Sequence, residues 1–508
     1  MFDTIIVGGG IGGLCAAALL ARHGRRVLVC ESHTIAGGAA HAFRREGFHF
    51  DSGPSFHCGL GDPKSLNPLR QILAVLGESL PTVPYSPFAH YHFPDSCFAV
   101  FGDAGRYSGA IAGVTQAGAR QFERFARRLL PMYEALADIP ILSLRADLGL
   151  LATLLGTYLG QTLKLLTLVG DLRSSTGQIL DRDVRDPWVR RLVDLECFLL
   201  SGLTAHGTVA PEFAFMWGER CRSPIDYPIG GGGAIVEALV RALKRWGGEI
   251  RLGAHVQTIL IEQGRVAGVQ LVGGERLDAP VVISNASLWD TYTKLVPAGA
   301  LNPAFLRSAL ALPAVDSFMH LHLGIRAEGL ESLSGHHVVV HADPLTHPGH
   351  TCMISIPSVW DPNLAPAGHH VLHAYSLEPF APWQRDNRYH ERKRERALPL
   401  YRAIERIIPD LKNRIVLELI GTPLTHARYL RRFQGSYGPA IMPAVGTFPG
   451  PATPITGLYR VGDTTLPGIG LPAVAASAIL CVNSLVEPER TAELVAASTS
   501  SPLKAKTT

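Results

Sequence analysis

A glycine-rich loop close to the start of the chain constrains the fold more than any other feature of the sequence. Residues 2–7 (FDTIIV) form an apolar run short enough to be a buried parallel strand. Residues 8–13 (GGGIGG) follow at once, and residues 14–24 predict a helix of small side chains that stops at a glycine. A second apolar run at 26–30 ends in Glu31. This order predicts the first strand–helix–strand unit of a doubly wound α/β fold.

Each part of this unit has a physical role in binding a dinucleotide. Gly8 allows the tight turn, Gly10 lets the backbone approach a pyrophosphate, and Gly13 lets the helix pack closely on the sheet. Gly12 belongs to the same loop, and the helix N-terminus there offers free N–H groups to phosphates. Glu31 stands 18 residues beyond Gly13, in position to accept hydrogen bonds from the adenosine ribose hydroxyls. The sequence therefore predicts a dinucleotide site.

The residues that follow Glu31 distinguish FAD from NAD. The segment AGGA at 36–39 comes a few residues later. Its glycine pair, Gly37 and Gly38, resembles the FAD-binding extension of the amine oxidase and phytoene desaturase superfamily. Simple NAD dehydrogenases of the Rossmann type do not need this extension. The resemblance therefore implies that the cofactor is FAD and that Gly37 and Gly38 contact it.

The other end of the chain carries a second segment of the same kind. Residues 457–486 predict a short strand that ends in Gly462 and Asp463, followed by a helix that begins near Gly470 and Leu471. This pattern resembles the closing FAD motif of the superfamily. The resemblance implies that the acid reaches the ribityl–pyrophosphate region and that the helix N-terminus faces the flavin, where it can stabilise negative charge. Two such segments so far apart predict a discontinuous FAD domain.

A third segment lies between these two. Residues 227–271 predict a loop, an amphipathic helix, a short strand and a hairpin, and the glycine run at 230–233 is interpreted as the turn into the helix. In relatives, a residue like Val256 holds the adenine through its backbone, which the resemblance carries over to Val256. The segment at 281–286 (VVISNA) predicts one more strand that returns to the FAD sheet.

A closer resemblance covers residues 1–487. The chain resembles the carotenoid isomerase (prolycopene isomerase) branch of the phytoene desaturase-like flavoproteins. The segments that carry this resemblance are 47–55 (GFHFDSGPS), 196–201 (ECFLLS), 227–233 (YPIGGGG), 283–295 (ISNASLWDTYTKL), 355–373 (SIPSVWDPNLAPAGHHVLH), 421–432 (GTPLTHARYLRR) and 437–441 (YGPAI). One segment departs from it, because residues 468–477 (GIGLPAVAAS) are more similar to the desaturases.

The resemblance implies a long apolar polyene, a carotene, as the substrate. The leading hypothesis is flavin-dependent cis-to-trans isomerisation of poly-cis carotenes, of the type that converts prolycopene to all-trans-lycopene and needs the flavin reduced. The alternatives are a carotene desaturase, a saturase that reduces an isoprenoid double bond, and a non-enzymatic escort protein that binds isoprenoids. The electron donor for the flavin is left open. In all the enzymatic cases the flavin supplies the difficult chemistry.

The same comparison gives the domain organisation. We expect a Rossmann-type FAD-binding domain from residues 1–85, 227–299 and 421–487. Residues 86–226 and 300–420 should form a substrate domain with a mixed sheet and helices. Residues 488–508 are small and polar, and this composition predicts a disordered tail.

A leucine-rich stretch at 147–172 predicts contact with a membrane. It is marginally long enough to span a bilayer, but it contains Gln161 and Lys164, and FAD segments lie on both sides of it. We therefore expect a helix that dips into one membrane surface, where a carotene can enter. The alternative is a core helix of the substrate domain. No signal or transit segment is recognised before the first strand, which predicts a peripheral protein on the cytoplasmic side.

Candidate catalytic residues are few. His320 and His322 alternate on a predicted strand, so both lie on one face, where they are candidates for proton donors above the flavin. Glu196 is a candidate for an acid in the substrate pocket, with a structural role as the alternative. Asp51 is expected to cap a turn. The histidines form no ligand motif in the sequence, so no metal site is predicted.

The overall charge excludes one class of partner. The chain has 508 residues, and its 47 basic and 43 acidic residues nearly cancel, leaving a formal charge of +4. A nucleic-acid-binding protein needs a concentration of positive charge, so no nucleic-acid partner is expected. The mean hydropathy of +0.16 is high for a water-soluble chain and agrees with a lipid-like ligand or a membrane surface.

Overall fold

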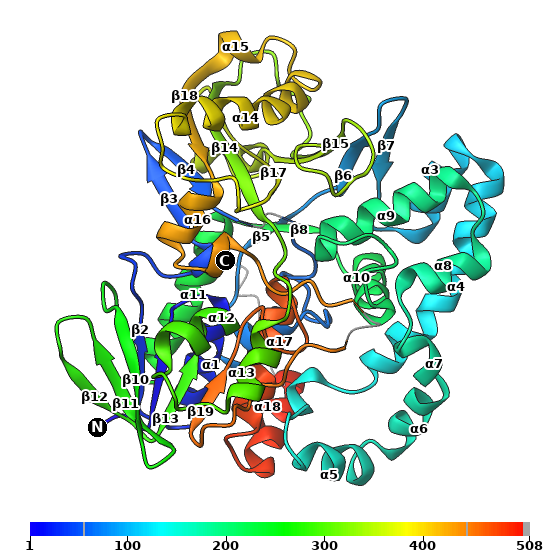
Figure 1. Ribbon diagram of the computed structural model, residues 1–508. Coiled ribbons are helices and arrows are strands. Elements are labelled where there is room, and N and C mark those ends of the chain that lie inside the picture. The colour runs from blue at the N-terminus through cyan, green and yellow to red at the C-terminus, as the bar shows by residue number, and fades with distance from the viewer. Residues whose placement is uncertain (54–55, 443–445, 501–508) are drawn as a thin grey trace, which may run out of the picture.

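The computed structural model describes residues 1–53, 56–442 and 446–500 (Figure 1). A five-stranded parallel sheet with the strand order β19-β13-β1-β2-β9 forms its first layer. The strands are β1 (Thr4–Val7), β2 (Val27–Cys30), β9 (Glu249–Arg251), β13 (Val281–Ser284) and β19 (Leu458–Arg460). All residues of β1 and β2 are buried, as expected for short apolar parallel strands covered on both faces.

Different layers cover the two faces of this sheet. The helices α1 (Ile11–Arg22), α11 (Gly231–Arg245) and α17 (Leu471–Asn483) pack against one another on one face. On the other face lies a three-stranded antiparallel sheet of β10 (Val256–Glu262), β11 (Arg265–Leu271) and β12 (Arg276–Asp278). The small side chains of α1 permit its close packing, and every residue of that helix except the last is buried.

A seven-stranded mixed sheet forms the second half of the molecule (Figure 1). Its order is β18-β14-β17-β16-β15-β6-β7, and only β15 and β6 run parallel to each other. The strands are β6 (Ala89–His92), β7 (Cys97–Val100), β14 (Ser317–Arg326), β15 (His336–Val340), β16 (Thr351–Ser355), β17 (His369–Glu378) and β18 (Ile415–Gly421). The predicted fold class, a Rossmann-type α/β unit with a separate mixed sheet, is confirmed.

The two faces of the long strand β14 have different partners. Met319, Leu321 and Leu323 point to a core covered by α14 (Tyr389–Glu405), whereas His320 and His322 point to the opposite face. Further helices pack on the β6–β7 end of the sheet. They are α3 (Ala104–Val114), α4 (Gln116–Ala137), α8 (Thr176–Asp183), α9 (Pro187–Ser201) and α10 (Ala210–Arg222).

The remaining elements are short connections. The strands among them are β3 (Ala42–Arg45), β4 (Phe48–Asp51), β5 (Thr82–Pro84) and β8 (Asp226–Pro228). The α-helices are α2 (Pro68–Val75), α12 (Leu288–Asp290), α13 (Pro303–Leu310), α15 (Leu411–Arg414) and α16 (Pro423–Tyr429). The other helical turns are η1 (Gly38–Ala40), η2 (Ile141–Ser143), η3 (Thr291–Leu295), η4 (Pro357–Val359), η5 (Pro362–Leu364) and η6 (Phe433–Gly435).

The leucine-rich stretch is not one helix. It forms α5 (Gly149–Gly156), α6 (Leu159–Thr167) and α7 (Val169–Leu172), and none of their residues is buried. The alternative of a core helix is therefore wrong. Gly156 ends α5 and, like the β-branched Thr157 that follows, has a low helix propensity, which favours the break. Within the described residues, no helix is long and apolar enough to cross a bilayer.

The predicted disordered tail also needs correction. Residues 488–500 form α18 (Pro488–Ser500), which packs against α2 and η2. Leu494 is completely buried in the core beneath α1 and α17 and anchors this helix. The apolar positions of this tail are too few for composition to indicate the helix, which is stabilised by the packing of Leu494 and Val495 on the core. Residues 501–508 lie outside the described part of the chain.

Candidate functional site

An elongated cavity lies along the carboxyl-terminal edge of the parallel sheet. Val7 at the end of β1, Glu31 after β2, Asn285 after β13 and Asp463 after β19 all line it. This edge of a parallel sheet is where ligands bind in doubly wound folds, because the loops and helix N-termini converge there.

The cavity brings together most of the predicted cofactor residues. Those that line it are Gly8, Gly10, Glu31, Gly37, Gly38, Val256, Asp463, Gly470 and Leu471. They come from three segments that are far apart in the sequence and meet only through the strand order of the sheet. The segment around Gly37 reaches the loop directly, since the Gly37 N–H donates a hydrogen bond of 2.7 Å to the carbonyl of Gly9.

The other three predicted residues lie just behind the cavity wall. A Cβ atom on Gly12 would stand 3.1 Å from the Cα of Gly462, and one on Gly13 would stand 2.2 Å from the carbonyl oxygen of Gly8. These glycines therefore allow the start of α1 to touch both the β1 turn and the segment after β19. Their role in the structure is close packing, while the neighbouring glycines line the cavity.

Backbone groups hold Glu31 in place at the cavity. Its carboxylate accepts hydrogen bonds from the N–H of Gly9 at 2.7 Å and from the N–H of His33 at 2.6 Å. The side chain is 8% exposed, so its charge is largely removed from water. An acid fixed in this way presents its remaining acceptor positions to the cavity, as recognition of ribose hydroxyls requires.

Asn285 was not predicted and lies against the glycine loop. A Cβ on Gly10 would stand 2.6 Å from its Nδ2, and a Cβ on Gly12 would stand 2.8 Å from its Oδ1. A side chain at Gly10 or Gly12 would therefore collide with Asn285. Without side chains at these two positions, the backbone of the loop is accessible to a ligand. This geometry fits the pyrophosphate of a dinucleotide. The only sequence indication was a polar residue near the end of a predicted strand.

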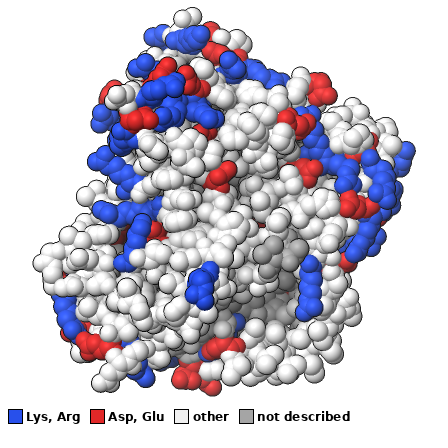
Figure 2. All heavy atoms as spheres, in the orientation of Figure 1, with Lys and Arg blue, Asp and Glu red and all other residues white. Residues whose placement is uncertain are grey.

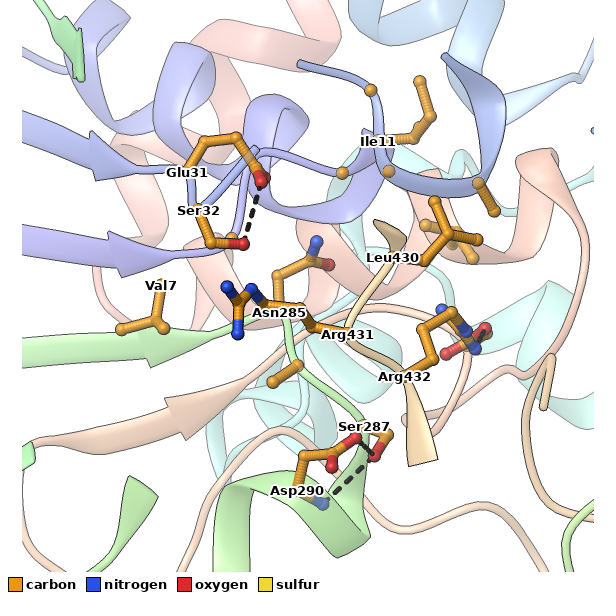
Figure 3. Close-up of a pocket in the computed structure, with 18 of the residues that line it drawn as sticks. Val7, Ile11, Glu31, Ser32, Asn285, Ser287, Asp290, Leu430, Arg431 and Arg432 are labelled. Atoms are coloured by element: carbon orange, nitrogen blue, oxygen red, sulfur yellow. Dashed lines mark hydrogen bonds and ion pairs between the residues drawn. The ribbon is translucent and has the colours of Figure 1, made fainter. Parts of the chain in front are cut away.

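Basic residues line the cavity as well. In Figure 3, Arg431 and Asn285 are seen between Glu31 and Asp290. Arg432 forms an ion pair with Asp463, and Lys294 lies beyond Asp290, with Nζ 2.6 Å from its Oδ1. In the described part of the structure, Arg431 is exposed and makes no hydrogen bond or ion pair of its own. Its guanidinium is therefore available to an anionic ligand.

The helix α17 begins at the cavity, which Ile469 and Tyr437 also line. Gly470, with a φ of +96°, precedes the first helical residue, Leu471, and both line the cavity. The unsatisfied N–H groups of this helix terminus, together with its dipole, favour negative charge in their neighbourhood. The predicted helix start is therefore correctly placed beside the cavity.

Another helix N-terminus, that of α11, is capped from within the protein. The Asp51 carboxylate accepts hydrogen bonds of 2.8 Å from the Gly232 N–H and 2.9 Å from the Tyr227 hydroxyl. Burial raises the pKa of Asp51 to about 6, while both hydrogen bonds act in the opposite direction. The glycine run at 230–233 is thus the turn into a helix, as predicted, and Asp51 caps it.

Glu196 does not lie at the cavity. It is buried on α9, where its carboxylate pairs with the Arg220 guanidinium through two hydrogen bonds of 3.0 Å and accepts a third from Tyr107. All its interactions are with other core residues, so the structure supports the structural alternative and not a pocket acid. The sequence missed this because Arg220 stands 24 residues away on another helix.

His320 and His322 also lie behind the cavity wall. Burial holds the pKa of His320 well below its usual value and lowers that of His322 to about 4. Both rings are therefore neutral near pH 7, and neither residue is among those that line the cavity. The structure also places His373 and His426 beside these two residues, a proximity that the spacing in the sequence does not indicate.

Known proteins that resemble this chain also indicate a flavin cofactor for the cavity. The family described as flavin containing amine oxidoreductase matches residues 11–387. The chain belongs to this family. A chloroplastic prolycopene isomerase of Daucus carota is 34% identical over 95% of this chain and 79% of that protein. The chain is therefore a member of the prolycopene isomerase branch, and its cofactor is FAD.

More distant relatives share the architecture. A neurosporene-forming phytoene desaturase of Rhodobacter capsulatus is 26% identical over 94% of this chain and 92% of that protein. The solved structure of an oxidoreductase from Methanosarcina mazei superimposes with a TM-score of 0.61 at 22% identity, covering 94% of this chain and 98% of the other. The structural similarity agrees with the fold of the family, and the family match together with the 34% identical relative shows that the chain is an FAD-dependent enzyme.

Proposed function

We propose that FAD lies along the cavity in one direction. The adenosine end lies between Glu31 and Val256, and the pyrophosphate lies on the glycine loop at Gly8 and Gly10. Arg431 reaches the phosphates as a counter-charge that the sequence analysis missed. The flavin end lies at the start of α17, where Gly470 and Leu471 face it. The observations that support this direction are the fixed Glu31 carboxylate and the accessible backbone of the glycine loop beside Asn285.

We propose that the enzyme isomerises poly-cis carotenes to their all-trans forms. The single observation that carries this is similarity along nearly the whole chain to a prolycopene isomerase, at 34% identity against 26% for a phytoene desaturase. Bound FAD supplies the electron chemistry, in its reduced form. The protein binds and orients the cofactor, excludes water and stabilises negative charge at the N-terminus of α17.

The nearest alternatives are a carotene desaturase and an isoprenoid saturase. An anaerobic reaction with poly-cis lycopene in liposomes separates all three, with products identified by chromatography and mass. A product of unchanged mass supports the isomerase. A product with two hydrogens fewer assigns the protein to the desaturases, and one with two hydrogens more assigns it to the saturases.

We propose in addition that the surface formed by α5, α6 and α7 rests on a phospholipid bilayer. The leucines that line this surface are exposed over half or more of their area; they are Leu148, Leu151, Leu155, Leu159, Leu163 and Leu166. In Figure 2, charged side chains gather over the upper part and right edge of the molecule, whereas the lower right, where Figure 1 shows α5 to α7, is largely uncharged. Exposed leucine at this density is costly in water and favourable at the lipid interface.

A further inference from the structure

Four histidines gather between the seven-stranded sheet and the cofactor cavity. His320 and His322 alternate along β14, and His373 on β17 pairs directly opposite His322. His426 on α16 packs against His320, with ring centroids 4.4 Å apart. All four side chains are buried. Because they come from three segments of the chain, their proximity is a property of the fold alone.

Two of these rings form a hydrogen-bonded pair. His320 Nδ1 lies 2.6 Å from His373 Nε2, and the ring planes differ by only 9° at a centroid separation of 4.9 Å. The rings therefore meet edge to edge in nearly one plane, as an N–H···N hydrogen bond requires. The two remaining nitrogens, His320 Nε2 and His373 Nδ1, are buried without a partner among the described residues.

The two unpartnered nitrogens differ in protonation. In a neutral pair, one ring donates the shared hydrogen, so its far nitrogen is a lone pair, while the far nitrogen of the other ring carries a hydrogen. Whichever ring donates, the pair thus presents one buried lone pair with no partner. An unsatisfied buried acceptor is costly in the neutral state and calls for an explanation.

A metal ion does not provide that explanation. One ring nitrogen from each of His320, His322 and His373 lies within 4.8 Å of the other two. However, the three ring planes are parallel to within 9° of each other. A lone pair lies in the plane of its ring, and the ligands of a tetrahedral ion must point to one centre about 2 Å away. Parallel rings, two of them already joined by a short hydrogen bond, do not converge in this way.

The pair is close to the cofactor cavity. Tyr437 lines the cavity, and its hydroxyl oxygen is 3.3 Å from His426 Nδ1. His426 in turn contacts His320. Leu430 and Arg432, in the segment that follows α16, line the cavity as well. Two side chains, Tyr437 and His426, therefore connect the pair to the cavity.

The surroundings of the pair hold it neutral before the flavin is reduced. Burial lowers the pKa of both His320 and His373 well below the usual value, and the neighbouring histidines lower it further. The titratable or charged groups that face the pair directly or through one neighbour are His322, Tyr375, His426, Tyr437, Arg432, His41 and Asp51. Asp51 approaches only through its backbone carbonyl, which lies 3.2 Å from His322 Nε2.

We propose that the His320–His373 pair takes up one proton when the flavin in the adjacent cavity is reduced. An external two-electron reductant supplies two electrons to the flavin, and two protons enter the site. One proton binds the flavin, which keeps a negative charge. The other binds the unpartnered lone pair of the histidine pair, which gains a positive charge. The shared hydrogen bond then becomes charge-assisted and is strengthened.

The driving force is the added charge of the flavin. A negative charge nearby favours the protonated form of a histidine, and its effect is large in an interior that screens poorly. The proton in turn stabilises the reduced flavin, which is the form that the proposed isomerisation needs. His320 and His373 are thus positioning residues that act on the redox state of the cofactor, through Tyr437 and His426.

The test is the reduction potential of the FAD-bound protein, measured anaerobically at several pH values around neutrality. Each proton taken up with two electrons contributes about 30 mV per pH unit to the slope. We expect the slope of the wild-type protein to exceed that of His373→Gln by this amount. Equal slopes in the two proteins would overturn the proposal.

A matched control exists in the same sheet. His337 on β15 also forms a histidine pair, with Nδ1 3.1 Å from His92 Nε2, but two strands away from β17. His337→Gln is expected to keep the wild-type slope. A loss of slope in this variant as large as in His373→Gln would contradict the assignment to the His320–His373 pair.

A second measurement tests the proposal even if His373→Gln binds FAD too weakly for its reduction potential to be measured. In protein with ¹⁵N-labelled histidine, the ring resonances absent from His320→Gln and His373→Gln identify the pair. On reduction of the wild-type flavin we expect these resonances to move to positions typical of a protonated ring. Resonances that stay in place would overturn the proposal. Neither experiment uses a carotene, so both remain informative if the proposed substrate is wrong.

Discussion

The backbone N–H of Gly9 donates a hydrogen bond of 2.7 Å to the carboxylate of Glu31, across 22 residues of sequence. This contact joins the glycine loop to the end of the second strand. It ties the position expected to hold the adenosine ribose to the position expected to hold the pyrophosphate. A change in the charge of Glu31 therefore acts on both parts of the proposed FAD site.

Glu31→Gln should weaken FAD binding. The amide keeps the shape of the side chain but loses the charge that strengthens its hydrogen bonds, which contribute about 1.5–3 kcal/mol each when one partner is charged. We expect the dissociation constant for FAD to rise by roughly 10- to 100-fold, measured by titrating the apoprotein. Glu249→Gln, at an exposed position on the neighbouring strand β9, should bind FAD as the wild type does. Equal affinities for the two variants would argue against the ribose site.

Glu196→Gln should destabilise the fold. Replacing the carboxylate leaves the buried Arg220 guanidinium without a counter-charge, which costs about 3–5 kcal/mol. Thermal unfolding of the FAD-bound protein should show a large fall in the transition temperature. The double variant Glu196→Met, Arg220→Met should recover most of this loss, because it leaves no unpaired charge. A Glu196→Gln protein of normal stability that cannot turn over substrate would instead revive the role of a pocket acid.

His57 should make the protein less stable in acid. Burial lowers its pKa to about 4 in the folded state, from a usual value of 6.5, and its Nε2 has no partner in the described structure. The unfolded chain therefore binds a proton first, and stability is lost as the pH falls from 6.5 towards 4. For this one group the loss amounts to roughly 3 kcal/mol.

The variant His57→Gln tests this prediction. It should show a smaller fall in unfolding free energy between neutral pH and pH 4, measured by denaturant titration. His390→Gln, which removes an exposed histidine, should show the same fall as the wild type. An unchanged pH dependence in His57→Gln would contradict the account.

The leucine surface should determine membrane binding. Leu155 and Leu163 are 57% and 55% exposed on α5 and α6. Replacing both by serine should weaken binding to phospholipid vesicles by at least about tenfold, since each buried leucine contributes about 1.5–3 kcal/mol. Flotation with liposomes measures this. The control replaces Leu252 and Leu398, which are 48% and 47% exposed on other elements. If the control replacements reduced flotation as much as the replacements on α5 and α6, the α5–α7 surface would not be the site of membrane binding.

Much of the cofactor site could be predicted because its chemistry requires glycine at fixed spacings. Gly10, Glu31 and Gly470 stand at the junctions of predicted strands and helices, where local pattern is sufficient. Asn285 and Arg431 could not be found in this way. Their importance depends on where β13 and the segment after α16 meet the glycine loop, which is a property of the tertiary fold.

Long-range pairing explains the other errors. Alternation along β14 predicted that His320 and His322 share a face, but the partner of His320 is His373, 53 residues away. The role of Glu196 was ambiguous for the same reason. Its position in the sequence is the same whether its carboxylate pairs with Arg220, as in the structure, or faces a ligand. Periodicity specifies which face a residue occupies, and only the fold specifies what covers that face.

The central claim is that the enzyme isomerises a carotene on reduced FAD without consuming electrons. The most direct measurement supplies fully reduced, FAD-bound protein with a large molar excess of poly-cis lycopene under anaerobic conditions. The reducing equivalents that remain are then titrated with a known oxidant. The account predicts many molecules of all-trans-lycopene per enzyme and a flavin that is still fully reduced. Conversion that stops after one product per flavin, with the flavin oxidised, would contradict it.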